Sequence, residues 1–439
     1  MIEDLLARWI PHQRWFAGKG RPIDTLRVET DTPLRDGLRH LILAVRQGGS
    51  VERYQLLLGE RRDLPDRLRH ARIADDLFDA AHDPDSTHLL LVAMAGGEDH
   101  GPLRFRHLPG VEIDTSPRSL VLGAEQSNTS LVYGDAYICK LFRRLTPGAN
   151  PELEITRALA ERRAKHIAEP YGWIETELDD EPTTLAIMQQ FLSTANDGWD
   201  LALASVRDLY GSLPGMDPGQ AGGDFSAEAC RLGAATAEIH RELAAAFPTD
   251  VVEPAEVKRM VEAFQRNLER MVAEVPELGP YAPAVETAFR EVEERTGVVP
   301  VQRVHGDYHL GQVMRTATDW IILDFEGEPG QPLAERRALA SPLRDVAGML
   351  RSFDYAARHL LLDHPNPEEL EERAAGWTAR NREAFLDGYT RGGGRFTDAD
   401  AALLRALEYG KAVYEVGYEA RNRPHWLPIP LAAFGRPLT

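Results

Sequence analysis

The chain has 439 residues, 43% hydrophobic and 27% charged, a composition typical of a folded globular protein and not of a disordered one. Fifty lysine and arginine residues against 69 acidic residues give a formal net charge of −19, so nucleic acids and anionic membrane surfaces are poor partners. The only two cysteines, Cys139 and Cys230, exclude a disulfide framework and an all-cysteine metal site.

Length and hydropathy set the next expectations. At roughly 150 residues per domain, the chain should contain two or three structural units. No apolar run approaches the roughly 18 residues that a membrane span needs. The first ten residues mix charged and apolar positions and predict an amphipathic helix, not a signal peptide. We therefore expect a cytoplasmic protein, and the sequence leaves its oligomeric state open.

Residues 1–110 are predicted to form a unit of their own. The opening helix is followed by a break at residues 13–22 that is rich in glycine and basic residues. Short β-type runs come next, for example 41–45 and 54–58. Residues 89–94 form a further buried run that ends before two glycines.

Residues 111–196 are expected to carry strands around a polar loop. A strand near 119–122 leads into the loop, and residues 131–142 predict two strands joined by the tight Gly134-Asp135 turn. Asn150 followed by a proline predicts a helix start, because proline suits the first helical position. A strand-like run at 184–188 follows.

Helical patterns dominate residues 197–439. Apolar residues recur at helical spacing in several segments, namely 227–244, 257–275, 282–296 and 402–421. One β-like stretch, residues 301–326, interrupts them.

That β-like stretch also carries the most informative chemistry. Asp307 lies in a Val-His-Gly-Asp-Tyr-His motif, the carboxamide of Gln312 follows five residues later, and Asp324 ends an apolar run. One carboxylate to orient an attacking hydroxyl, with an amide and a second carboxylate to hold Mg²⁺, is the set that phosphoryl transfer needs. The alternative is a hairpin without catalytic function, in which these residues act as turns and caps.

The segments together resemble the kinase-like fold of aminoglycoside phosphotransferases and, more closely, the bacterial maltokinase family. The matching stretches are residues 13–18, 124–130, 324–329, 342–348, 411–415 and 423–430. The resemblance implies an α+β, bilobal fold. It consists of an N-terminal cap (1–110), a small β-rich ATP-binding lobe (111–196) and a large, mostly helical lobe (197–439) with the catalytic loop and acceptor site.

The resemblance also implies roles for the nucleotide-binding residues, with ATP and Mg²⁺ as cofactors. Lys140 matches the strand lysine that pairs with the α- and β-phosphates. Its partner is expected on the following helix, with Glu154 favoured over Glu152. Ser127 is expected to contact phosphate, although the loop holds a single glycine and could also be a plain polar hairpin turn.

Asp307 is then the catalytic base or orienting group, and Gln312 and Asp324 are the metal ligands. His305 is expected to fix the catalytic loop by hydrogen bonds. Asp345 is expected to cap the backbone of that loop from a helix, or else to cap the helix start.

The resemblance implies a sugar as the acceptor. Sugars present hydroxyl edges and apolar faces, so their sites combine carboxylates with aromatic rings. The predicted contacts comprise Asp307 and five C-terminal residues, namely Glu408, Glu415, Tyr418, Glu419 and Trp426. The alternative is an exposed charged helix face followed by a tail that docks on the core.

The identity of the acceptor stays open between glucosamine, phosphorylated to glucosamine 6-phosphate, and maltose, phosphorylated to maltose 1-phosphate. The maltokinase pattern has an aspartate where this chain has Gly410, which removes a carboxylate expected to hold a disaccharide hydroxyl. An aminoglycoside-type phosphotransferase and a non-catalytic pseudokinase are the remaining alternatives.

Overall fold

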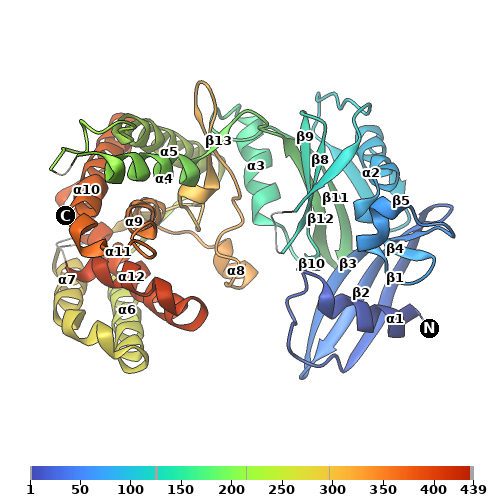
Figure 1. Cartoon of the computed structure of the whole chain (residues 1–439), viewed down its shortest axis with the longest axis horizontal. Helices are drawn as coiled ribbons and strands as arrows, with labels where there is room; N and C mark the ends of the chain where they lie inside the picture. The colour runs from blue at the N-terminus through green and yellow to red at the C-terminus, as the bar shows by residue number, and fades with distance from the viewer. Residues whose placement is uncertain (1, 124–126, 214, 296, 436–439) are drawn as a thin grey trace. The chain divides into compact units, whose positions relative to one another are not determined.

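The computed structural model describes residues 2–123, 127–213, 215–295 and 297–435, and the chain divides into two compact units (Figure 1). Unit 1 comprises Met1–Ala160 and Ala168–Ser193, and unit 2 comprises Glu161–Ile167 and Thr194–Thr439. Unit 1 is rich in strands and unit 2 is mostly helical. The predicted α+β fold, with one β-rich and one helical part, is confirmed.

The first sheet of unit 1 is antiparallel, with the order β1-β2-β3-β10 and with β4 added on β3. Its strands are β1 (Thr25–Arg35), β2 (Leu38–Gln47), β3 (Ser50–Glu60), β4 (Leu77–Asp79) and β10 (Arg144–Leu145). The amphipathic opening segment forms α1 (Ile2–Trp9), whose Leu6 is fully buried against this sheet together with Trp15 and Phe16.

The second sheet of unit 1 has seven antiparallel strands in the order β5-β6-β11-β12-β9-β8-β7. They are β5 (Asp99–His100), β6 (Leu103–His107), β7 (Ser119–Leu122), β8 (Thr129–Tyr133), β9 (Tyr137–Leu141), β11 (Pro170–Leu178) and β12 (Glu181–Gln190). Because β6 pairs with β11, this sheet continues across the boundary expected near residue 110. The three predicted domains and the two boundaries between them stay predictions.

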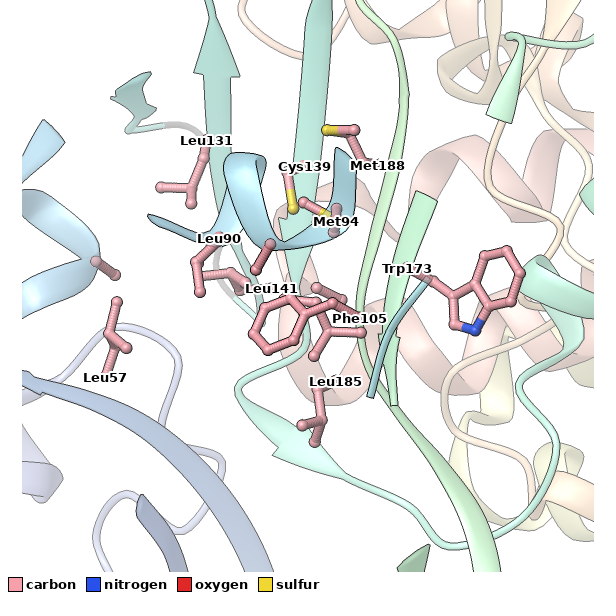
Figure 2. Packing of buried hydrophobic residues seen from close by; sticks show 14 of the residues in the cluster. Leu57, Leu90, Met94, Phe105, Leu131, Cys139, Leu141, Trp173, Leu185 and Met188 are labelled. Atoms are coloured by element: carbon pink, nitrogen blue, oxygen red, sulfur yellow. The ribbon is translucent and has the colours of Figure 1, made fainter. Parts of the chain in front are cut away.

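The larger hydrophobic cluster of unit 1 joins the second sheet, α2 (Pro84–Gly96) and residues of the first sheet such as Leu57. Figure 2 shows Leu90 and Met94 of this helix near Cys139 and Leu141 of β9. The buried run at 89–94 is thus the middle of a helix, because a short, wholly apolar run carries no period that separates a strand from a helix.

Two local predictions, for the turn before β9 and for the helix start at residue 151, are confirmed. Gly134 has φ = 56° in the turn between β8 and β9, a left-handed conformation that favours glycine. The helix α3 (Pro151–Glu161) begins at its proline, and Asn150 Oδ1 accepts a hydrogen bond from the Leu153 amide at 3.1 Å.

Unit 2 is built from helices around three short strand pairings. Its helices are α4 (Gly198–Gly211), α5 (Ser226–Ala246), α6 (Pro254–Glu274), α7 (Ala282–Arg295), α8 (Leu333–Arg336), α9 (Leu343–His359), α10 (Pro367–Arg391), α11 (Asp398–Asn422) and α12 (Pro428–Ala432). Its strands are β13 (Asn196–Asp197), β14 (Asp250–Val252), β15 (Val299–Val301), β16 (Val313–Arg315) and β17 (Trp320–Ile322). Only three-residue strands form within the β-like stretch 301–326, and a long loop joins β15 to β16.

Neither cysteine is in a disulfide: Cys139 is buried and Cys230 is half-buried. Among the residues that the structure describes, no helix has the length and apolar character that crossing a bilayer requires.

Candidate active site

The loop after β15 is anchored from below by Asp345 of α9, which is 1% exposed. Its carboxylate accepts hydrogen bonds from the backbone amides of His305 at 2.8 Å and Gly306 at 2.9 Å. Its Oδ2 also lies 3.1 Å from Nε2 of His240. Burial acts to raise the pKa of Asp345, but the hydrogen bond and charge of His240, with the backbone donor, hold it below its usual value. Asp345 is therefore a charged carboxylate that fixes the loop backbone.

His305 joins this loop to the end of β17. Its Nε2 lies 2.7 Å from the Leu323 carbonyl oxygen, and its Nδ1 accepts the amide of Asp307 at 3.3 Å. This pattern assigns the neutral tautomer with the proton on Nε2. The ring therefore sets the spacing between Asp307 and the segment that carries Asp324.

The loop is also pressed tightly onto α9. A Cβ atom placed on Gly348 would lie 2.5 Å from the carbonyl oxygen of Tyr308, so only glycine permits this contact. The Tyr308 hydroxyl is 2.8 Å from Thr236 Oγ1, and the Leu310 amide donates to Ser352 at 3.0 Å. Asp307 thus projects from a loop whose backbone is held on both sides.

Gln312 and Asp324 lie on neighbouring segments of the hairpin formed by β16 and β17. The Leu323 amide donates to the Gln312 carbonyl oxygen at 2.9 Å. Asp324 has φ = 64°, a left-handed conformation that costs a non-glycine residue about 1 kcal/mol. An amide oxygen and a carboxylate are hard ligands of the kind that Mg²⁺ prefers, so this donor set suits the ion.

In unit 1, Lys140 of β9 forms an ion pair with Glu152 of α3. The Lys140 Nζ atom lies 3.4 Å from Oε2 of Glu152, whose side chain is 2% exposed. We expected Glu154 as the partner of Lys140; the structure shows a contact with Glu152, and the role of Glu154 stays a prediction. The helix begins at Pro151, so Glu152 falls on its buried face and Glu154 is only half-buried. The start of the helix was correct, but its rotation about its own axis was not predictable from the capping residues.

The polar loop between β7 and β8 is held at both described ends, whereas Ala124, Glu125 and Gln126 lie outside the described residues. Arg14 donates to the Gly123 carbonyl oxygen at 2.8 Å, and Arg143 donates to Thr129 Oγ1 at 2.8 Å. Ser127 is exposed, and its contact with phosphate stays a prediction.

A cleft of about 710 Å³ opens in unit 2 beside Asp307. Five of the predicted acceptor residues line it, namely Asp307, Glu415, Tyr418, Glu419 and Trp426. The lining residues that we did not predict as site residues include Trp199, His309, Glu328, Tyr355, His359, Lys411, Tyr414 and Arg423. Lys411 and Tyr414 precede the predicted residues Glu415 and Tyr418 by four positions each, so they fall on the same face of α11. This helical spacing could have been used to predict them. The others come from separate elements, and no local pattern brings them together.

Arginines hold the carboxylates of this cleft in place. Arg351 donates to Glu415 Oε2 through Nε at 2.9 Å and Nη2 at 2.7 Å. Burial raises the pKa of Glu415 above its usual value despite this cation. Glu419 accepts from Arg423 at 2.7 and 2.9 Å. The Arg423 guanidinium also lies 4.1 Å from the ring centre of Trp426, which fixes the indole as a wall.

Glu408 and Gly410 do not belong to this cleft, and both expectations are corrected. Glu408 is fully buried and ion-paired with Arg382 of α10, with one contact at 3.1 Å. The Glu408 carboxylate is paired inside the helical core and does not line the cleft. Gly410 lines a different cavity, where Phe264 would be the nearest neighbour of an added Cβ at 3.4 Å.

Comparisons with known proteins agree with this fold. Residues 118–404 match the phosphotransferase enzyme family, and residues 9–83 match the maltokinase N-terminal cap domain. A glucosamine kinase of Streptacidiphilus jiangxiensis is 30% identical over 362 residues, 79% of this chain and 80% of that protein. A glucosamine kinase of Mycolicibacterium smegmatis is 29% identical over 324 residues, 70% of this chain and 77% of that protein.

A solved structure of a glucosamine kinase in complex with glucosamine, ADP and inorganic phosphate is also similar. It gives a TM-score of 0.72 at 25% identity and covers 99% of this chain and 98% of that chain. The family match, the curated relatives and this likeness define a kinase. The chain belongs to the phosphotransferase enzyme family and carries a maltokinase-type cap domain at its N-terminal end.

Proposed function

We propose that this kinase transfers the γ-phosphoryl group of ATP to glucosamine and forms glucosamine 6-phosphate. The observation that carries the proposal is the acidic cleft beside Asp307, which Glu328, Glu415 and Glu419 also line. An ammonium group on the acceptor suits such a cleft, because charge-assisted hydrogen bonds to carboxylates are stronger than neutral ones. The relatives and the solved structure named as glucosamine kinases support the same acceptor.

The chemistry requires one proton transfer and one displacement. The sugar hydroxyl oxygen forms a bond to the γ-phosphorus, and the bond from this phosphorus to the β–γ bridging oxygen breaks, so that ADP leaves. Asp307 orients the hydroxyl and accepts its proton. The fixed backbone of the loop keeps the carboxylate placed for this step, and positioning of this kind supplies much of the rate in phosphoryl transfer.

The nucleotide and its metal ion are assigned to the predicted residues. Lys140, held by Glu152, would pair with the α- and β-phosphates. Gln312 and Asp324 would hold Mg²⁺, which neutralises phosphate charge when it is bound. Ser127 would donate from the loop above the phosphates.

Acceptor recognition is assigned to the carboxylates and aromatic rings of the cleft. Glu415 uses Oε2 for Arg351, which leaves Oε1 to accept from a sugar hydroxyl or ammonium group. Trp426, held by Arg423, offers a flat face to the C–H groups of a pyranose, and Tyr418 is exposed at the rim.

Maltose is the second candidate acceptor, because residues 9–83 match the maltokinase cap domain. The absence of a carboxylate at position 410 no longer counts against maltose, since Gly410 lies outside the acceptor cleft. A site built to pair with a polar substituent can reject an analogue that lacks it by about 10⁴-fold. We therefore expect selection for the ammonium group of glucosamine.

The test is kcat/KM for glucosamine, maltose and kanamycin, measured by ADP release at saturating ATP with and without Mg²⁺. Phosphorus NMR of the product locates the phosphoryl group. We expect turnover of glucosamine at O6 that stops when EDTA is added. Efficient turnover of maltose with inert glucosamine would reassign the acceptor, and kanamycin turnover would indicate an aminoglycoside kinase. ATP binding without any turnover would indicate a pseudokinase.

A further inference from the structure

A second cavity of about 520 Å³ lies in unit 2 behind the catalytic loop. Its walls are largely apolar and come from α6, α9, α11 and the segments around β14 and β15. They include Val252, Val257, Met260, Phe264, Val299, Val301, Leu403 and Leu407. The volume falls within the range of about 300–1,000 Å³ that is typical of small-molecule sites. We call this cavity the rear chamber.

Position 410 of α11 helps to keep the rear chamber open. Gly410 has no side chain, and an added Cβ would only touch the Phe264 ring at 3.4–3.5 Å. Glycine in the middle of a helix costs about 1 kcal/mol relative to alanine, so this position gives up helix stability for space. A larger side chain here would enter the chamber and not the acceptor cleft.

The lining of the rear chamber includes two cations, Arg344 and Lys411, and one carboxylate, Glu328. Arg344 lies 3.8 Å from Glu328, a looser contact than a hydrogen bond, and 43% of its side chain is exposed. Lys411 lines both the chamber and the acceptor cleft, and among the described residues it has no hydrogen-bond or ion-pair partner. The excess positive charge favours one anionic group on a ligand whose body is apolar.

The rear chamber shares its wall with the catalytic loop. Gly306 and Tyr308, the two neighbours of Asp307, both line it. Gly348 of α9 lines the same chamber, and a Cβ added to it would lie 2.5 Å from the Tyr308 carbonyl oxygen, so the loop packs tightly against α9 beside the chamber. A molecule in the chamber would therefore bear directly on the backbone that places Asp307.

We propose that the rear chamber is a second ligand site for a small amphiphile with an aryl or short aliphatic body and one carboxylate. The body fills the apolar walls, and the carboxylate meets Arg344 and Lys411. Occupation shifts the affinity for the acceptor sugar, and the sugar shifts the affinity for the amphiphile by the same factor. This coupling rests on the proposed sugar-kinase function, whereas binding of the amphiphile does not.

The test is isothermal titration of the full chain with 4-phenylbutyrate, and with 4-phenylbutanol as the uncharged analogue. We expect saturable 1:1 binding of the carboxylate, and binding of the alcohol weaker by about tenfold, since each factor of ten corresponds to about 1.4 kcal/mol. Gly410→Leu and Leu407→Trp, which fill the chamber, should each weaken binding by about tenfold or more. Arg344→Gln should weaken the carboxylate but not the alcohol.

Gly211→Leu is the matched control, because Gly211 is another glycine at a helix with no atom near an added Cβ. It should bind 4-phenylbutyrate within about twofold of the wild type. Unaltered binding to both chamber-filling variants, or no saturable binding at all, would overturn the proposal. If 4-phenylbutyrate binds as expected but no sugar is phosphorylated, the second site stands and the proposed sugar-kinase function fails. If sugars are phosphorylated and binding of 4-phenylbutyrate leaves their affinity unchanged, the coupling is wrong.

Discussion

The catalytic loop and the α11 wall of the acceptor cleft are built in different ways. The loop is held by its backbone: Asp345 accepts two main-chain amides, and His305 contacts a main-chain carbonyl. The α11 wall is held by its side chains, through Arg351 on Glu415 and Arg423 on Glu419. The loop therefore depends on hydrogen bonds to its main chain, whereas the wall depends on ion pairs between side chains.

This difference explains where the two regions tolerate change. Removing a loop anchor leaves buried main-chain donors without partners, which costs stability directly. Removing an arginine–carboxylate pair at the cleft alters the position and charge of a group that faces the acceptor. We therefore expect substitutions in the loop to lower mainly the free energy of unfolding, and substitutions in the wall to raise mainly KM for the sugar.

The largest effect is expected at Asp307. Asp307→Asn keeps the size and polarity of the side chain but cannot accept the proton, so kcat should fall by about 10³-fold. The unfolding free energy should stay within about 0.5 kcal/mol of the wild type, because Asp307 is no anchor of the loop backbone. Stopped-time ADP release with glucosamine and urea denaturation measure the two quantities. Retention of more than a tenth of the activity would remove Asp307 from its proposed role.

Asp345→Ala should have the largest effect on stability. It removes the acceptor of two buried amides and of His240, and we expect a loss of about 3 kcal/mol in unfolding free energy. Denaturant titration checks this value, with the exposed acidic residue Glu369 changed to alanine as the matched control. A loss below about 1 kcal/mol would mean that the loop is not anchored by this carboxylate.

The Lys140–Glu152 pair extends the comparison to unit 1, where a side-chain contact holds the lysine that we propose binds the nucleotide. Glu152→Gln removes the charge that orients Lys140, and we expect kcat/KM for ATP to fall by about 10²-fold. Glu154→Gln, two residues away on the same helix, should change it less than about threefold. Equal effects of the two substitutions would contradict the orientation of α3 seen in the structure.

Which features could be predicted from the sequence depends on whether they are set by local chemistry or by packing between elements. The positions of Asp307, Gln312 and Asp324 along one short stretch, and the helix start at Pro151, depend on local chemistry and were predictable. Which face of α3 or α11 is buried depends on packing against other elements. The contact of Glu152 with Lys140 was therefore not anticipated, and Glu408 was assigned to the cleft although it pairs with Arg382. The rear chamber, whose walls come from distant segments, left no signal in the sequence.

Glu415→Gln separates the wall from the core within α11. It keeps the hydrogen-bonding shape but removes the charge that we assign to the acceptor, so KM for glucosamine should rise by about tenfold at nearly constant kcat. Glu408→Gln breaks the buried pair with Arg382 and should lower stability by about 3 kcal/mol without changing KM. Steady-state kinetics and urea denaturation of both variants give the comparison. A raised KM in the Glu408 variant would return Glu408 to the acceptor site.

The smallest effect concerns a main-chain anchor in unit 1. Gln55 donates from Nε2 to the carbonyl oxygens of Phe142 at 2.8 Å and Leu185 at 2.6 Å. Its Oε1 therefore accepts from Nε2 of the buried His40 at 2.9 Å, and Nδ1 of His40 has no hydrogen-bond partner among the described residues. Protonation would place a second, unpaired donor in the core near Arg143. Burial accordingly lowers the pKa of His40 to about 4.

In the unfolded chain the pKa of His40 lies near the ordinary value of about 6.5, so the unfolded state binds the proton first as the pH falls. The stability that His40 contributes is complete above that value and is lost progressively as the pH drops toward 4. Between pH 7 and pH 6 the loss should be under about 1 kcal/mol, and at pH 5 about 2 kcal/mol. Urea denaturation at these three pH values checks the slope, and His40→Gln should remove this part of it. An unchanged slope in that variant would mean that His40 is not the group whose protonation lowers the unfolding free energy. The hydrogen bonds of Gln55 would then be insensitive to acid in this pH range.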